Sequence, residues 1–175
     1  MNSEQLLEKL SLHCDTLRTL LQQQTIALRD LSRRLVQIIQ QLRKNIDVRD
    51  SDFATDFNTY VQTLREKLDR IEPTWTELRA QIRQTPDKNW NAEVALLAKG
   101  LNSRAKTLSV TCDEFTTEYD LFAKNYKNFT AAKLNMWLLT SCQSDIDTLT
   151  GKVLFLAREI ARKTEQNRGP SYDER

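Results

Sequence analysis

From Ser3 to Asn45, apolar residues recur at alternating steps of three and four, which places them on one side of an α-helix. With Leu7 as position a of a heptad, the a and d positions form a mostly apolar seam: Leu7, Leu10, Cys14, Leu17, Leu21, Leu28, Leu31, Leu35, Ile38 and Leu42. No Gly or Pro interrupts the seam. The pattern therefore predicts one helix over residues 3–46, with a length of roughly 65 Å at the usual helical rise.

The same stepping predicts three further helices, over residues 52–84, 91–127 and 130–166. Pro73 lies within the second of them, but the apolar stripe stays in phase across it, so a bend is predicted rather than an end. Pro86 biases Thr85 away from the helical conformation, so we expect a loop there.

The boundary between the third and fourth helices has the weakest sequence signal. Residues 125–130 contain no Gly or Pro, and the seam slips by one position where Ala132 continues it. A turn and one continuous helix both fit this segment. The turn is favoured because a single helix of about 75 residues would far exceed the usual length.

Short connections between long helices favour antiparallel packing. The prediction is an all-α fold, an elongated antiparallel (up-down-up-down) four-helix bundle with coiled-coil-like packing, formed by residues 1–166 as one domain. Residues 167–175 are polar, and we expect a disordered tail. This topology would gather nine aromatic residues at one pole: Phe53, Phe57, Tyr60, Phe115, Tyr119, Phe122, Tyr126, Phe129 and Trp137.

Composition narrows the classes of function. Charged residues make up 29% of the chain but the formal net charge is only +2, so we do not expect the broad basic face of a nucleic-acid-binding protein. No apolar run approaches the ~18 residues of a membrane span, and the N-terminus lacks the features of a signal peptide. The three cysteines fall on helix seams, where they are expected to act as small, reduced apolar residues. These features predict a cytoplasmic or nuclear protein.

Few side chains could carry catalysis or bind a metal. His13 is the only histidine, which excludes the Glu-x-x-His pairs of a di-iron bundle and a zinc site built on His and Cys. Its neighbours give no support to a phosphotransfer role, so His13 is interpreted as a residue at the edge of the seam. There is no Gly-rich phosphate loop and no nucleophile with a second histidine to orient it. The sequence predicts no enzyme, no cofactor, no metal and no small-molecule substrate.

Some apolar residues of the first helix lie outside its seam. Leu12 and Ile26 occupy position f and Val36 occupies position b, which are normally polar in a self-contained bundle. Two interpretations stay open. They are either scattered exposed apolar residues or a contact with another chain.

The fourth predicted helix carries a second such group. Leu134, Trp137 and Leu138 share one face, and Phe129 precedes them in the sequence. Either Trp137 packs beneath the connecting loop, or the four residues form a partner-binding patch of the kind in which tryptophan is enriched.

The sequence thus predicts a non-catalytic helical interaction or adaptor protein, a subunit of a larger cytosolic assembly. Its partners would be other proteins, or further copies of the same chain, bound through apolar helix faces. Two alternatives remain. The first is an amphipathic bundle that acts at membrane surfaces, although its polar faces mix both charge signs. The second is a chaperone or carrier of an amphipathic helical peptide.

Overall fold

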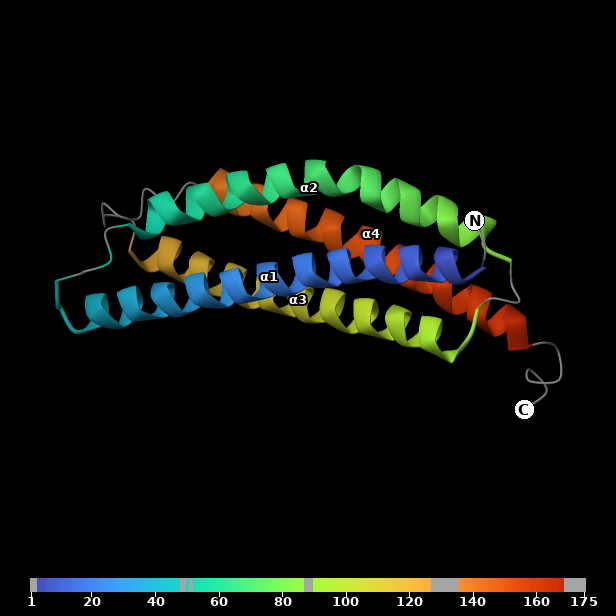
Figure 1. Ribbon diagram of the computed structural model, residues 1–175. Coiled ribbons are helices and arrows are strands. Elements are labelled where there is room, and N and C mark those ends of the chain that lie inside the picture. The colour runs from blue at the N-terminus through green and yellow to red at the C-terminus, as the bar shows by residue number, and fades with distance from the viewer. Residues whose placement is uncertain (1–2, 48–49, 51, 87–89, 127–135, 169–175) are drawn as a thin grey trace.

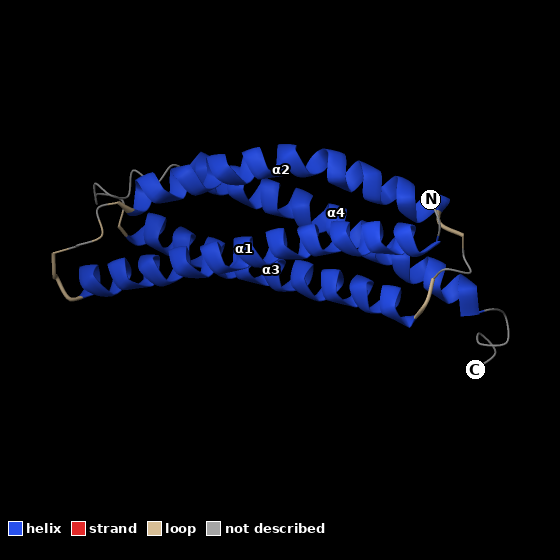
Figure 2. Cartoon of the chain, in the orientation of Figure 1, coloured by secondary structure: helices blue, strands red, loops and turns tan. Residues whose placement is uncertain are grey.

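The computed structural model describes residues 3–47, 50, 52–86, 90–126 and 136–168. These residues form four helices, α1 (Ser3–Arg43), α2 (Phe53–Gln84), α3 (Ala92–Asn125) and α4 (Met136–Arg168). No strand occurs among them (Figure 2). The predicted all-α class is therefore confirmed. The predicted tail from residue 169 onward lies outside the described residues.

The four helices run up, down, up and down along one long axis (Figure 1). α3 packs closely against both α1 and α4, and α2 packs less closely against the same two helices. The predicted bundle is confirmed, but consecutive helices do not always pack side by side, because α2 and α3 lie across the bundle from each other. A link of about seven residues reaches roughly 20 Å, which is enough to cross a bundle whose neighbouring axes are about 10 Å apart.

The predicted seam of α1 forms a large part of the core. Leu17, Leu21, Leu28 and Leu35 are fully buried, which is the arrangement that a heptad repeat produces between long helices. Burial of one leucine side chain contributes about 1.5–3 kcal/mol before the entropy of ordering is subtracted. The repetition of this contact along the bundle makes the fold cooperative.

Side-chain size explains why α3 makes the closest contacts. Its buried seam includes Ala98, Ala105 and Cys112, and α4 contributes Cys142 and Ala157 from its own buried face. Small residues let two helix backbones approach, whereas larger ones hold the axes apart. The buried residues of α2 are all larger: Phe53, Phe57, Val61, Leu64, Ile71, Leu78, Gln81 and Ile82.

α1 ends three residues before the predicted boundary at residue 46. Asn45 has a positive φ of 54°, a left-handed conformation that asparagine tolerates better than most residues. The N–H of Ile46 then donates to the carbonyl of Gln41 at 2.9 Å, which closes the helix end. The prediction was wrong there because apolar spacing does not register a left-handed residue.

α2 continues through Pro73 without interruption, as predicted, and is gently bowed in Figure 1. Pro73 is exposed on the side of α2 opposite the core, where its missing N–H leaves the fewest packed neighbours disturbed. At the end of the helix, Thr85 is extended, with φ −70° and ψ 125°. This is the conformation that Pro86 was predicted to impose.

α3 and α4 are separate helices, so a turn and not one continuous helix joins them. α3 ends at Asn125, two residues before the predicted boundary. The described part of α4 begins at Met136, and the predicted start at residue 130 lies outside the described residues.

The aromatic residues gather at the pole where α1 and α3 end and α2 begins (Figure 1). The ring of Phe57 lies 5.3 Å from that of Phe115 and 5.4 Å from that of Tyr119, and Phe122 lies 5.8 Å from Tyr126. The prediction was wrong for Trp137, which is exposed because it projects from the side of α4 opposite the core. Phe129 lies outside the described residues.

An arginine ties the end of α1 to the start of α2. The guanidinium of Arg34 donates two hydrogen bonds to Asp50, at 2.8 and 2.9 Å, and lies 2.9 Å from Asp56. The Asp50 carboxylate also accepts hydrogen bonds from the backbone of Asp52 and Phe53, so it caps α2. The hydrogen bonds from Arg34 lower the pKa of Asp50 below its usual value.

We predict that Arg34→Gln lowers the free energy of unfolding by about 1–2 kcal/mol at neutral pH. Because the folded-state pKa of Asp50 is depressed, this contribution is present above the unfolded pKa of about 3.9 and is lost as the pH falls through the folded value. Urea denaturation of both proteins as the pH is lowered should show the difference shrinking. Arg33→Gln is the matched control, since Arg33 is exposed. A difference independent of pH would contradict this account.

Candidate interaction face

The structure places the outer residues of α1 in two classes. Leu12 and Ile26 are 63% and 61% exposed, and both project directly away from the core. Val36 is only half-buried and lies toward the side of α1 that meets α3. Of the three predicted residues on α1, Leu12 and Ile26 are therefore free of any packing role in this bundle.

On α4, Trp137 is 70% exposed and Leu138 is half-buried against the core. The interpretation that Trp137 packs beneath the connecting loop is therefore wrong. Position decides this outcome, because the buried seam of α4 runs through Leu139 and Cys142 and leaves Trp137 on the opposite side. Leu134 and Phe129 lie outside the described residues, so the patch predicted with them remains a prediction.

α3 carries two exposed apolar residues that the sequence analysis missed. Leu96 and Val110 are 66% and 56% exposed. They are two heptads apart, as are Leu12 and Ile26 on α1. A search for apolar residues opposite the seam would have found them, but only the first and fourth helices were inspected in that way.

These exposed residues share one geometric property. Among the described residues, the five large apolar side chains that are more than half exposed all occupy the outermost position of their helix, opposite the buried seam: Leu12, Ile26, Leu96, Val110 and Trp137. The equivalent positions of α2 are polar or small: Thr59, Glu66, Pro73 and Ala80. We call the five residues the outer apolar set. It belongs to α1, α3 and α4, the three helices linked by the closest contacts.

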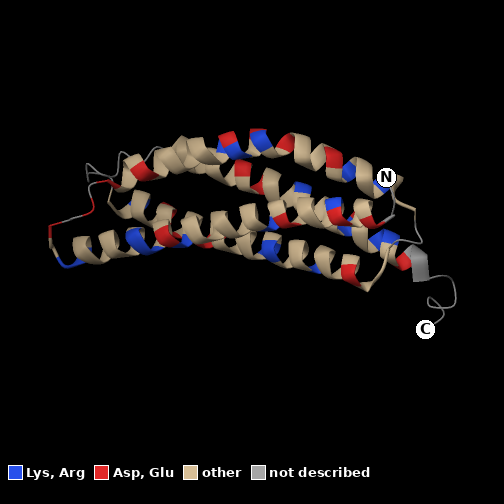
Figure 3. Ribbon diagram, in the orientation of Figure 1, with Lys and Arg blue, Asp and Glu red and all other residues tan. Residues whose placement is uncertain are grey.

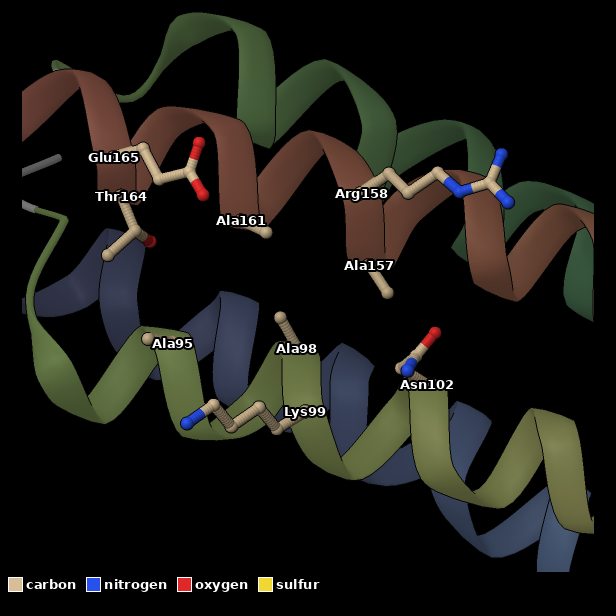
Figure 4. Close-up of a pocket in the computed structure, with 9 residues that line it drawn as sticks. All are labelled: Ala95, Ala98, Lys99, Asn102, Ala157, Arg158, Ala161, Thr164 and Glu165. Atoms are coloured by element: carbon tan, nitrogen blue, oxygen red, sulfur yellow. The ribbon is translucent and has the colours of Figure 1, made fainter. Parts of the chain in front are cut away.

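A recess of about 370 Å³ lies between α3 and α4 (Figure 4). The side chains of Ala98, Ala157 and Ala161 point into it, and they are too small to fill the groove between the two helices. Charged side chains border this alanine floor: Lys99, Arg158 and Glu165. The recess therefore offers an apolar floor with a rim of mixed charge.

The charges of the bundle are mixed in sign. Lys and Arg alternate with Asp and Glu along the helices in the view of Figure 3, in keeping with the net charge of +2. Several of these charges pair between helices, for example Lys9 of α1 with Glu77 of α2 at 3.4 Å, and Lys152 of α4 with Glu72 of α2. These pairs lie along the looser contacts of α2.

His13 lies in one of these contacts. Its Nδ1 is 3.1 Å from Oε1 of Gln81, and its Nε2 is 3.7 Å from Oε2 of Glu77. The histidine thus bridges α1 to α2 at the edge of the seam, where the sequence analysis placed it.

One layer of the core is polar. Cys112 of α3 and Cys142 of α4 are buried and hydrogen-bonded to each other. That hydrogen bond, together with burial, raises the pKa of Cys142. The hydroxyl of Tyr60 is buried near both thiols without a hydrogen-bond partner among the described residues, and burial raises the pKa of Tyr60.

Asp145 is a further buried ionisable group, one turn along α4 from Cys142. Its closest cation is Arg65 of α2, with Nε 3.8 Å from Oδ2. Burial raises the pKa of Asp145 despite this ion pair.

The described residues contain no group of three or more His, Cys, Asp or Glu side chains arranged to hold a metal ion. Within the same part of the chain, no helix has the length and apolar composition needed to cross a membrane. Comparisons with protein-family models, curated proteins and solved structures gave no match to this chain. Its function is therefore argued from its own surface.

The two tryptophans at opposite extremes of exposure give a test of these placements. We predict that Trp137→Ala changes the free energy of unfolding by about 0.5 kcal/mol or less, because the side chain is largely solvated. Trp90→Ala should lower it by about 3–5 kcal/mol, because Trp90 is 1% exposed. Urea denaturation followed by circular dichroism measures both. Equal losses for the two variants would place Trp137 in the core.

Proposed function

We propose that this chain is a non-catalytic helical interaction protein, an adaptor or subunit of a larger cytoplasmic assembly. The observation that carries the proposal is the location of the outer apolar set, whose five members all lie opposite the buried seams. Residues at these positions contribute nothing to packing within the bundle. Large apolar side chains there, concentrated on some helices only, are typical of surfaces that another protein covers.

The spacing of the set supports a helix as the partner's contacting element. Leu12 and Ile26, and likewise Leu96 and Val110, are two heptads apart, which corresponds to about 21 Å along a helix. A partner helix with apolar residues at heptad spacing can meet such a row along its whole length. Trp137 adds a large aromatic side chain of the type that dominates binding energy in interfaces.

The distribution of the set among the helices supports a one-sided interface. α3 lies between α1 and α4, and all three carry members of the set, whereas the outermost residues of α2 are polar or small. α2 would then face solvent in the assembly. The recess beside Ala98 lies between two helices of this side and could receive one apolar side chain of the partner.

Two other functions fit the amphipathic helices less well. Binding to an anionic membrane surface favours polar faces rich in Lys and Arg, but the charges of this bundle alternate in sign (Figure 3). A carrier of a helical peptide would need an open apolar groove, whereas the recess between α3 and α4 has a charged rim. The cytoplasmic location we propose rests on three buried cysteines that are all free thiols.

The experiment compares partners of the wild-type chain with those of the double variant Leu96→Ser, Val110→Ser. Both residues are exposed, so helicity and melting temperature should not change. Affinity purification from the native cell with quantitative mass spectrometry should show at least one protein whose recovery falls about tenfold. Sedimentation velocity of the purified chains tests self-association in the same pair.

The matched control is Thr59→Ser with Ala80→Ser, two outermost positions of α2. It should recover the same proteins as the wild type. If the α3 variant and the wild type recover the same proteins in equal amounts and sediment identically, the proposed function is wrong.

A further inference from the structure

Cys112 and Cys142 come from different helices and meet in the core. Cys112 lies on the buried seam of α3, and Cys142 lies on that of α4. These two helices make one of the two closest helix contacts in the bundle. The thiol of Cys142 donates a hydrogen bond to the sulfur of Cys112.

The register of the two helices brings the cysteines together independently of that hydrogen bond. Ala98 of α3 and Ala157 of α4 point into the same recess between the two helices (Figure 4). Cys112 lies two heptads further along α3 than Ala98, and Cys142 lies two heptads and one residue before Ala157. Because α3 and α4 are antiparallel, these two displacements lead to the same level of the bundle.

The surroundings of the pair suit thiol oxidation. The hydrogen bond from Cys142 lowers the pKa of Cys112, and so favours the thiolate that reacts with oxidants. The hydroxyl of Tyr60, buried near both sulfurs without a partner among the described residues, makes this layer of the core polar. Cys14, in contrast, lies on α1 in an apolar seam, where burial raises its pKa to about 12.

We propose that Cys112 and Cys142 are a modification site, a dithiol that hydrogen peroxide converts into a reversible disulfide joining α3 to α4. The Cys112 thiolate attacks one peroxide oxygen, forms a sulfenic acid and releases hydroxide. The Cys142 sulfur then attacks the sulfenic sulfur, forms the disulfide and releases water. In total, two thiols and one peroxide give one disulfide and two waters, and a dithiol reductant reverses the reaction.

The disulfide would close the chain segment that runs from the end of α3 to the start of α4. Closing a loop of about 30 residues restricts the unfolded chain and raises the melting temperature, by roughly 10 °C for a domain of this size. The inference is independent of the proposed partner binding, since both cysteines are buried and neither belongs to the outer apolar set.

The experiment treats the full-length folded chain with hydrogen peroxide. The number of titratable thiols should fall from three to one per chain, and peptide mapping should identify one Cys112–Cys142 cross-link within a monomer. The melting temperature should rise by roughly 10 °C and return to its first value with dithiothreitol.

Two variants control the assignment. Cys14→Ser should form the cross-link and show the same rise in melting temperature, whereas Cys142→Ser should form none. Three thiols remaining after oxidation of the folded wild type would overturn the proposal. Cross-linking between chains, oxidation to sulfinic or sulfonic acid as the main product, or a fall in the melting temperature would also overturn it.

Discussion

The close approach of α3 to its two neighbours is the constraint on which the rest of this structure depends. Ala98, Ala105 and Cys112 present little bulk toward α1 and α4, so the backbones come near each other and leucines of the neighbouring seams fill the remaining space. The same close contact brings Cys112 within hydrogen-bonding distance of Cys142. It also leaves the alanine-floored recess, where four small residues face one another and nothing fills the groove.

α2 follows a different rule. Its buried residues are bulky, its backbone stays further from its neighbours, and polar side chains bridge the intervening edges. Arg34 reaches Asp50 and Asp56 at one pole, while Lys152 pairs with Glu72 and lies over the ring of Trp75. The bundle thus combines three tightly packed helices with a fourth held by aromatic packing and ion pairs. The outer apolar set is confined to the three.

Most of the fold could be predicted from the sequence, because the stepping of Leu17, Leu21, Leu28 and Leu35 fits only a helix with one buried side. Helix ends were less predictable, since they depend on single residues such as Asn45, whose left-handed backbone leaves no mark in the apolar pattern. Which helices are neighbours was not predictable either, because the link after Thr85 is long enough for more than one arrangement.

The candidate face was only partly predictable from the sequence. The exposure of Leu12 and Ile26 follows from their heptad position alone, and the same logic applied to α3 would have found Leu96 and Val110. For Trp137 the sequence left two outcomes open, because the connection that precedes it decides whether the ring is covered. The Cys112–Cys142 pair required the antiparallel register of α3 and α4, which no local pattern contains.

Hydrogen exchange of the backbone amides in the native state tests the central claim most directly. If α3 is the helix on which the others pack most closely, the amides around Leu101, Leu108 and Phe115 exchange only through global unfolding, and those around Leu64 and Ile71 of α2 exchange at a lower opening free energy. Equal protection of α2 and α3, or faster exchange in α3, would contradict the account.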